Sequence, residues 1–301
     1  MWQQLLQEIS RENVKALART ISLVENEVAG YLRFLQELPT SSTPVIGITG
    51  PPGAGKSTLT DALIEQMVNA DKKVGVLCID PSSPFHLGAL LGDRIRMSQW
   101  YNHKNVFIRS LATRGSLGGL HPKIIEITDV MKAAWFDYII VETVGVGQSE
   151  VEIAGLADTT VVVVVPEAGD EIQTMKAGLM EIANVFVVNK ADRPDADAFV
   201  HNLKQMLAPA FSTQNQTIEI IKTIASEKKG IDNLYVAIEK HLQLMNHHDK
   251  KLYLLAEKAF HLIQQHKMQH IHKANLKQAI EKEYGLSNFN LYRFISAYYN
   301  E

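Results

Sequence analysis

The stretch Val45-Ile46-Gly47-Ile48-Thr49-Gly50-Pro51-Pro52-Gly53-Ala54-Gly55-Lys56-Ser57-Thr58 decides the fold of this chain. Residues 45–49 form an apolar, β-branched run typical of a buried strand, and residues 59–67 have the pattern of a helix. Between them, the glycines let the backbone turn tightly and direct successive N–H groups at one anion. The stretch therefore predicts a strand, a phosphate-binding loop and a helix whose positive end faces the same phosphate.

The loop also carries two side chains that suit a nucleoside triphosphate. Residues 50–57 match the pattern G-x-x-x-x-G-K-S, in which Lys56 can reach the β- and γ-phosphates and the Ser57 hydroxyl can ligate Mg²⁺. A glycine turn with an exposed lysine is the alternative, but it does not explain a strand before the loop and a helix after it. The predicted nucleotide-binding residues are Gly50, Pro51, Pro52, Gly53, Ala54, Gly55, Lys56, Ser57 and Thr58, and Lys56 is also predicted to be catalytic.

Strand-like and helix-like segments alternate through the middle of the chain. The expected strands are 45–49, 74–79, 105–109, 137–142, 159–165, 184–189 and 218–224, and the expected helices are 56–70, 121–134, 170–182, 195–208 and 231–246. Strands separated by helices indicate an α/β fold with a doubly wound, mostly parallel sheet. The run Val161–Val165 is apolar enough for a strand that is buried on both faces.

The two ends of the chain are expected to add helices to this domain. Residues 1 to about 38 have helical periodicity and 39–44 read as a linker, which gives an N-terminal extension (1–43), a nucleotide-binding domain (44–246) and a helical appendage (247–301). The appendage either packs on the domain or forms the arm of a homodimer, and the sequence does not decide between these. A homodimer is the expected assembly.

Composition excludes several classes of function. The 301 residues are 46% hydrophobic, which is ample for a core, and the net charge of −3 with no basic run argues against nucleic-acid binding. The single cysteine, Cys78, lies in an apolar run and is expected to be a reduced core thiol. The first ten residues are too polar for a signal peptide and no apolar stretch could span a membrane, so a soluble, cytoplasmic protein is expected.

A second motif predicts which base is bound. Asn189-Lys190-Ala191-Asp192 follows a strand, and a carboxylate at Asp192 can accept from both the ring N–H and the exocyclic amine of guanine, whereas adenine lacks that pair of donors. Residues Ile224, Ala225 and Ser226, at the end of a later strand, would place backbone N–H groups near the guanine carbonyl. Asn189, Lys190 and Asp192 are therefore predicted to read guanine.

Acidic residues after neighbouring strands are candidates for the Mg²⁺ site. Glu142 closes a strand, and Gly145 can turn its N–H toward the γ-phosphate, with Gln148 as the candidate that positions the attacking water. The alternative for Glu142 is an exposed strand-end acid. Asp80 and Asp93 lie in the segment expected to form a first switch, where each is a metal or switch residue or else a cap or turn residue.

For the other polar residues, the sequence either leaves two possible roles open or predicts an ordinary structural role. Arg109 and Arg114 belong to a basic, glycine-rich segment that either contacts nucleotide or partner or is a solvated loop. The acids of residues 167–171 are typical of ordinary helix capping. From the residues themselves, Lys176 is predicted to be a surface residue. His266 and His270 have the spacing of metal ligands but no evident third ligand, so they are predicted to belong to a solvated helix face.

Several of these motifs together resemble a known family, the P-loop GTPases associated with methylmalonyl-CoA mutase, of the MeaB/ArgK type. The matching segments are ALARTISLVE (16–25), GPPGAGKST (50–58), IDPSSPF (79–85), LGDRIRM (91–97), RGSLGGL (114–120), VETVGVGQSE (141–150), GDEIQTMKAG (169–178) and NKAD (189–192). Departures are Glu167, where the family usually has glycine, and Ile224, where serine commonly precedes Ala225.

The resemblance implies a SIMIBI-like GTPase fold and a role for the chain. It assigns Asp80, Asp93 and Glu142 to the Mg²⁺ site and first switch, 145–153 to a second switch, and 167–178, with Asp170 and Lys176, to a third switch that contacts the mutase. The implied function is a chaperone that uses GTP to gate adenosylcobalamin loading and protect the mutase. The chain lacks the cobalamin signature D-x-H-x-x-G, so the cofactor would sit on the partner. The alternative is a kinase or ATPase linked to arginine/ornithine transport.

Overall fold

The computed structural model describes most of the chain and divides it into two compact units. The described residues are 1–80, 97–114, 120–145, 149–168, 182–211, 218–244, 248–268, 270–285 and 289–299. The first unit is Met1–Lys251 and the second is Leu252–Glu301.

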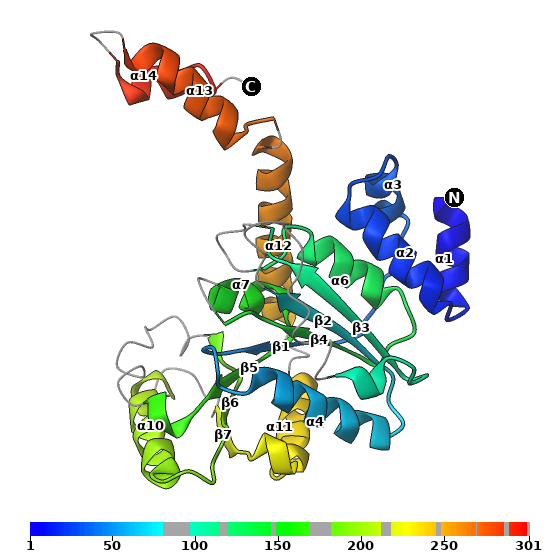
Figure 1. Ribbon diagram of the computed structural model, residues 1–301, viewed down its shortest axis with the longest axis vertical. Coiled ribbons are helices and arrows are strands. Elements are labelled where there is room, and N and C mark those ends of the chain that lie inside the picture. Colours follow the sequence, from blue (N-terminus) through cyan, green and yellow to red (C-terminus); the bar gives the residue numbers. More distant parts are fainter. Residues whose placement is uncertain are drawn as a thin grey trace. The chain divides into compact units, whose positions relative to one another are not determined.

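The first unit is built on a seven-stranded sheet in which every pairing is parallel. The strands are β1 (Val45–Thr49), β2 (Val74–Asp80), β3 (Val106–Ala112), β4 (Tyr138–Glu142), β5 (Thr159–Val164), β6 (Val185–Val188) and β7 (Glu219–Lys222). Their order across the sheet is β3-β2-β4-β1-β5-β6-β7 (Figure 1). All seven predicted strands are confirmed, and the sheet is entirely parallel within the described residues rather than mostly parallel.

Helices cover both faces of the sheet, as the doubly wound prediction requires. On one face, α4 (Lys56–Asn69) and α11 (Ile231–Leu244) pack on alternate residues of the central strands, such as Ile46 and Ile48 of β1 (Figure 1). The thiol of Cys78 is buried in this same core, which confirms its predicted position. Because β1, β2, β4, β5 and β6 are buried along their whole length, they read in the sequence as continuous apolar runs.

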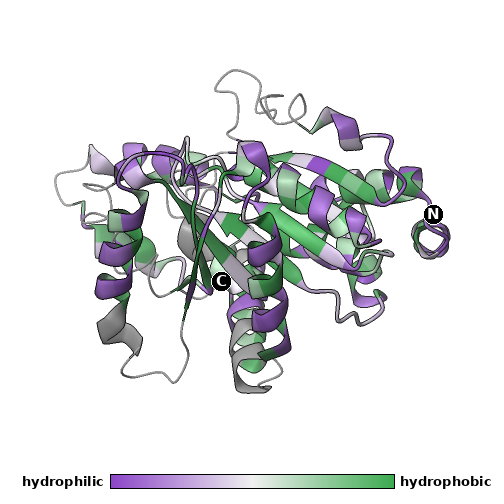
Figure 2. Ribbon diagram, turned by 90° about the horizontal axis from the view of Figure 1, so that it is seen from below, coloured by the Kyte–Doolittle hydropathy of each residue, from purple (hydrophilic) through white to green (hydrophobic). Residues whose placement is uncertain are grey.

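The opposite face carries α6 (Ile124–Lys132), α7 (Ser149–Leu156) and α10 (Ala196–Phe211). Figure 2 shows the strands mainly in green, the hydrophobic colour, between helices of mixed colour. Gly47 of β1 has a packing reason: a Cβ there would lie 2.6 Å from Ile153 Cγ1 and 3.0 Å from Ala157 Cβ. The glycine therefore lets α7 approach the sheet closely.

The N-terminal extension is three helices where the sequence predicts one. They are α1 (Trp2–Ser10), α2 (Val14–Glu25) and α3 (Tyr31–Gln36). The first break follows Glu12, whose φ of 60° leaves the helical region, and Asn13 then caps α2 by accepting from the backbone N–H groups of Lys15 and Ala16. The second break ends at Gly30, with φ of 90°. These breaks fold the extension into a layer on α6 rather than a long rod.

Apart from α7, for which the sequence predicts no helix, the remaining boundaries of the first unit differ little from those predicted. Short 3₁₀ turns connect the longer elements where the structure describes the chain: η1 (Ser98–Trp100), η2 (Pro166–Ala168) and η3 (Ala225–Glu227). β3 runs three residues longer than predicted, so Arg109 lies inside this strand and not in the loop after it. The predicted helix 170–182 lies almost entirely outside the described residues.

The second unit is helical, consisting of most of α12 (His248–Met268) with α13 (Lys273–Tyr284) and α14 (Leu291–Ser296). Its small core is aromatic: Phe289 and Phe294 have ring centroids 6.1 Å apart, with Tyr284 and Tyr298 beside them. His266 and His270 are exposed, as predicted, but α12 ends at Met268, so they do not share a helix. Within the described ranges, no helix combines the length and apolarity needed to cross a membrane.

Candidate functional site: a phosphate loop beside a base-reading motif

The strand order reverses its direction at β1. The strands that follow β1 in the chain first fill one side of it (β2, β3, β4) and then the other (β5, β6, β7). In open α/β sheets, ligands bind beyond the carboxyl ends of the strands where the order reverses in this way. The phosphate loop leaves β1 at this point, so the predicted anion-binding stretch occupies the position at which the topology opens the sheet.

The phosphate loop has the backbone geometry that its glycines predict. Gly50, Gly53 and Gly55 all have positive φ values, of 140°, 77° and 88°. Gly50 also has no room for a side chain, since a Cβ would collide with the backbone carbonyl of Val163 in β5. Lys56 is 7% exposed, and its Nζ donates to Gly50 O at 2.9 Å and to Pro51 O at 3.1 Å. Its ammonium group therefore lies folded over the loop.

The candidate metal residues meet at the adjoining strand ends. Ser57 Oγ donates to Glu142 Oε1 at 2.6 Å, and Glu142 is opposite Ile48 in the β1–β4 register. Asp80 ends β2, two residues beyond Cys78, which is the register partner of Glu142. Both acids are buried, Glu142 to 3% and Asp80 to 4% exposure. Glu142 is therefore not the exposed strand-end acid that was the alternative for this residue.

The chemistry of this donor set fits Mg²⁺ bound with phosphate. Within the described ranges, no group of three or more His, Cys, Asp or Glu residues could hold a metal alone. Mg²⁺ in phosphate sites needs fewer protein ligands, because one or two carboxylates act together with phosphate oxygens and water. A serine hydroxyl hydrogen-bonded to a buried carboxylate, with a second buried carboxylate on the next strand, provides hard oxygen donors of the required kind.

The segment after β4 is pressed against the phosphate loop. Thr143 Oγ1 and Thr49 Oγ1 are 2.9 Å apart, and Thr143 N donates to Ile48 O at 3.0 Å. Gly145, with φ of 84°, lies so close to the loop that a Cβ would collide with Gly50 O and with the ammonium of Lys56. A side chain at residue 145 is therefore incompatible with the observed position of Lys56.

Asn189 joins the base-reading motif to the phosphate loop. Its Nδ2 donates to Ala54 O at 2.9 Å, and its Oδ1 accepts from Thr223 Oγ1 and from Ala225 N, both at 3.1 Å. The side chain is buried, so it fixes three segments relative to one another. The N–H of Ala225, predicted to face the guanine carbonyl, is thus bonded to Asn189 in this structure.

Lys190 and Asp192 lie on the solvent side of the same corner. Lys190 Nζ donates to Gly53 O at 2.8 Å, and its φ of 56° turns the chain sharply after β6. Asp192 is exposed. Beside them Ile224 and Lys229 form an antiparallel bridge that closes a small loop around η3, with exposed Ser226 at its tip. The predicted base-binding residues are thereby brought to one rim, adjoining the phosphate loop.

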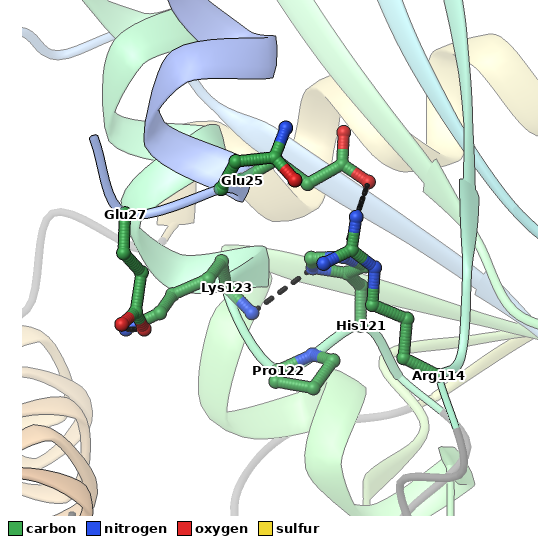
Figure 3. A pocket seen from close by; sticks show the side chains of 7 residues that line it. Glu25, Glu27, Arg114, His121, Pro122 and Lys123 are labelled. Atoms are coloured by element: carbon green, nitrogen blue, oxygen red, sulfur yellow. Dashed lines mark hydrogen bonds and ion pairs between the residues drawn. The ribbon is translucent and has the colours of Figure 1, made fainter. Parts of the chain in front are cut away.

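Three ion pairs of residues discussed above were not foreseen from the sequence. Glu167, in the first turn of η2, forms an ion pair with Arg193, the residue after the NKAD motif; the longer helix that the acids of 167–171 were predicted to cap lies outside the described residues. Arg109 and Arg114 both bind Glu25 at the end of α2, at 3.1 Å and 2.7 Å. Figure 3 shows the contact between Arg114 and Glu25. Both arginines contact the N-terminal helices, an outcome that neither interpretation of their segment included. The only signal in the sequence was that motifs 16–25 and 114–120 both belong to the family pattern.

Four predicted site residues lie outside the described residues: Asp93, Gln148, Asp170 and Lys176. Their assignments to the metal site, to the attacking water and to the third switch stay predictions.

Comparison with known proteins identifies the family. The family model of the methylmalonyl Co-A mutase-associated GTPase MeaB matches residues 17–279. A protein of Pyrococcus abyssi is 45% identical over 250 residues, which cover 81% of this chain and 77% of that protein. A fused isobutyryl-CoA mutase of Geobacillus kaustophilus is 36% identical over 250 residues, which cover 77% of this chain but 23% of that protein.

A solved structure, that of a LAO/AO transport system kinase, has the same fold. Its TM-score is 0.67, with 24% identity, and the alignment covers 100% of this chain and 98% of that one. This likeness supports the parallel, helix-covered sheet. The family model matches residues 17–279, and the phosphate loop and the NKAD motif lie on one rim. Membership of this family implies binding of guanine nucleotide. We conclude that the chain belongs to the methylmalonyl-CoA mutase-associated family of P-loop GTPases.

Proposed function

We propose that this protein hydrolyses GTP with Mg²⁺ and thereby gates the loading of adenosylcobalamin into an acyl-CoA mutase, which it also protects. The observation that carries the partner is the relative named a fused isobutyryl-CoA mutase, in which a segment similar to this chain is part of one polypeptide that bears the mutase name. The cofactor would be held by the mutase, since this chain lacks the cobalamin signature.

The nucleotide would lie across the rim formed by the phosphate loop and the NKAD motif. Backbone N–H groups between Gly50 and Ser57 would surround the phosphates, at the N-terminus of α4. Lys56 would exchange its present contacts with Gly50 O and Pro51 O for phosphate oxygens, because an ammonium group is more strongly attracted to an anion than to a carbonyl. Asp192 would accept from guanine, while Lys190 keeps the rim attached to the loop.

Ser57, Glu142 and Asp80 would hold Mg²⁺, with Asp93 added from the sequence prediction. The ion supplies positive charge that offsets the developing negative charge on the phosphates. Gly145 would sense the γ-phosphate through its N–H, because it already lies against Gly50 and Lys56. Gln148 would orient the attacking water, and residues 167–178, with Asp170 and Lys176, would transmit the nucleotide state to the mutase.

The experiment is GTP hydrolysis measured with and without a purified B12-dependent acyl-CoA mutase, with ATP as the competing nucleotide. Acceleration of GTP turnover by the mutase is expected, since a switch that waits for its partner turns over slowly alone. A wild-type protein that hydrolyses GTP at the same rate with methylmalonyl-CoA mutase and with isobutyryl-CoA mutase as without them would contradict the proposed client class, although not the nucleotide.

A second candidate is a kinase linked to arginine or ornithine transport, suggested by the name of the solved structure that shares this fold. Phosphate transfer requires an acceptor and a base to activate it, whereas the described acids of the site already have other proposed roles: Asp192 would read guanine, and Glu142 and Asp80 would hold Mg²⁺. Incubation with γ-labelled ATP and candidate acceptors separates the two functions. Label on an acceptor, with ATP preferred over GTP, would replace the GTPase proposal.

We also propose that the protein is a homodimer. Light scattering of the whole chain tests this directly, with a mass near 67 kDa expected for two copies of the 33.6 kDa chain. A mass of one chain at micromolar concentration would overturn the dimer.

A further inference from the structure

A single carboxylate gathers three basic side chains at the border between the N-terminal helices and the sheet. Glu25 is the last residue of α2, and its side chain is 12% exposed. Its Oε2 accepts from Arg109 Nη2 at 3.1 Å and its Oε1 accepts from Arg114 Nη2 at 2.7 Å. His121 Nε2 lies 3.6 Å from the same Oε1. Figure 3 shows Glu25, Arg114 and His121 converging beside a pocket. The volume of this pocket is about 320 Å³.

The three partners belong to the end of β3 and to the turn before α6. Arg109 is inside β3 and also donates to Ser22 Oγ of α2 at 3.0 Å. Arg114 lies two residues beyond the strand, with φ of 48°. This conformation costs energy for a residue other than glycine, so it persists only where surrounding contacts compensate for the cost. His121 Nδ1 accepts from the backbone N–H of Lys123, so its Nε2 is the nitrogen that faces Glu25. Glu25 therefore holds two separate stretches on α2.

This cluster is directly connected to a candidate metal residue. Thr113, next to Arg114, donates its backbone N–H to the carbonyl oxygen of Asp80 at 3.0 Å. Asp80 is also in register with Ala112 across β2 and β3. Arg114 is thus next to the residue whose amide is hydrogen-bonded to the backbone of the buried acid, at the edge predicted to bind Mg²⁺.

We propose that Glu25 is a positioning residue of the nucleotide site, which acts through Arg114 and Thr113 on Asp80 and so couples the N-terminal helices to Mg²⁺ binding. This inference rests on the proposed function, in which Asp80 is a Mg²⁺ residue. Groups behind the direct metal ligands commonly set metal affinity, because they fix the orientation of the ligands themselves.

Attachment of the N-terminal helices does not by itself explain the cluster. Apolar packing already fixes α2, since Leu17, Ile21 and Val24 are fully buried against α6 residues such as Ile127 and Val130. Compared with apolar residues in its place, a mostly buried carboxylate with guanidinium partners adds little net stability, because removing the charges from water costs about as much as their attraction returns; only the loss of one partner alone is destabilising. A positional role for Arg114 accounts for a cluster that stability alone does not require.

The test compares Glu25→Gln with Glu27→Gln as its matched control. Glu27 lines the same pocket and pairs with Lys123 at 2.7 Å, at the N-terminus of α6 and not at the end of β3. GDP binding is titrated at rising Mg²⁺ concentration and also in EDTA. For Glu25→Gln we expect the half-saturating Mg²⁺ concentration to rise about 2- to 30-fold, the range found when networks between sites are altered. The control and the affinity in EDTA should not change.

A second readout needs no nucleotide. Hydrogen exchange at the Thr113 amide should accelerate in Glu25→Gln and in Arg114→Gln, and stay at the wild-type rate in Glu27→Gln. Arg114→Gln serves if Glu25→Gln does not fold, because Arg114 is a partly exposed residue at the end of the cluster. Unchanged Thr113 exchange, or unchanged Mg²⁺ dependence in a folded variant, overturns the proposal. Accelerated exchange in a protein that binds no guanine nucleotide would contradict the proposed function instead.

Discussion

At the scale of single residues, Lys56 offers the most direct test of the phosphate loop. Its ammonium group is buried over Gly50 and Pro51, with Gly145 against it. In Lys56→Ala we expect GTP turnover to fall at least about 100-fold, because removing one preorganised charge at a developing anion costs that much. Single-turnover assays with GTP measure the effect. Turnover within threefold of wild type would mean that the phosphates bind elsewhere.

Asp192 tests base selection without touching the phosphates. Asp192→Asn replaces two acceptor oxygens by one acceptor and one donor, so guanine loses a partner and meets a donor clash. We expect the GTP-over-ATP preference to drop by about 10- to 100-fold, since one hydrogen bond to a charged group contributes about 1.5–3 kcal/mol. Competition binding of GDP and ADP measures this. Asp195→Asn, also exposed and three residues away, is the matched control and should keep the wild-type preference.

Single residues also show where sequence reasoning stops. The phosphate loop and the NKAD motif were recognisable because the residues that give each motif its function are adjacent in the sequence. The contacts that join them were not, since Asn189 and Ala54 are 135 residues apart in the chain. Arg109 and Arg114 were left between two interpretations for the same reason: their partner, Glu25, precedes them by 84 and 89 residues.

At the scale of elements, Gly47 controls how closely α7 packs on β1. In Gly47→Ala the new Cβ would lie 2.6 Å from Ile153 Cγ1, so α7 must shift, and we expect the free energy of unfolding to fall by about 1–3 kcal/mol. Gly155→Ala, in α7 with no atom within 4 Å of the new Cβ, should instead be neutral or stabilising by up to about 1 kcal/mol. Urea unfolding of both variants distinguishes a packing cost from a helix-propensity gain. A stabilised Gly47→Ala would refute the close approach.

The elements differ in how well the sequence predicts them. The strands were predictable because burial on both faces forces long apolar, β-branched runs such as Thr159–Val164. The N-terminal extension kept one helical periodicity across two breaks, so it read as a single helix. Its breaks depend on Glu12 and Gly30 adopting positive φ. The packing of α2 on α6 stabilises this backbone conformation, but that packing exists only in the folded protein.

At the scale of the whole first unit, the cluster around Glu25 makes stability depend on pH. The contact with His121 contributes most, followed by Arg109 and Arg114, and together they hold the pKa of Glu25 at about 2, against burial, which raises it from the ordinary 4.5. Because the folded pKa lies below the unfolded value, the stabilisation is complete above pH 4.5 and is lost as the pH falls toward 2.

The wild-type advantage over Glu25→Gln should therefore be on the order of 1–2 kcal/mol at pH 7, after allowance for solvent screening, and should shrink steadily below pH 4.5. Urea unfolding at pH 7, 4.5 and 3 measures the difference. Ser22→Ala is the control, because it removes an Arg109 contact but no titrating group, so its deficit should stay constant with pH. A Glu25→Gln deficit that is equally constant would mean that the charge of Glu25 does not stabilise the fold, and that α2 is held on the sheet by its apolar contacts alone.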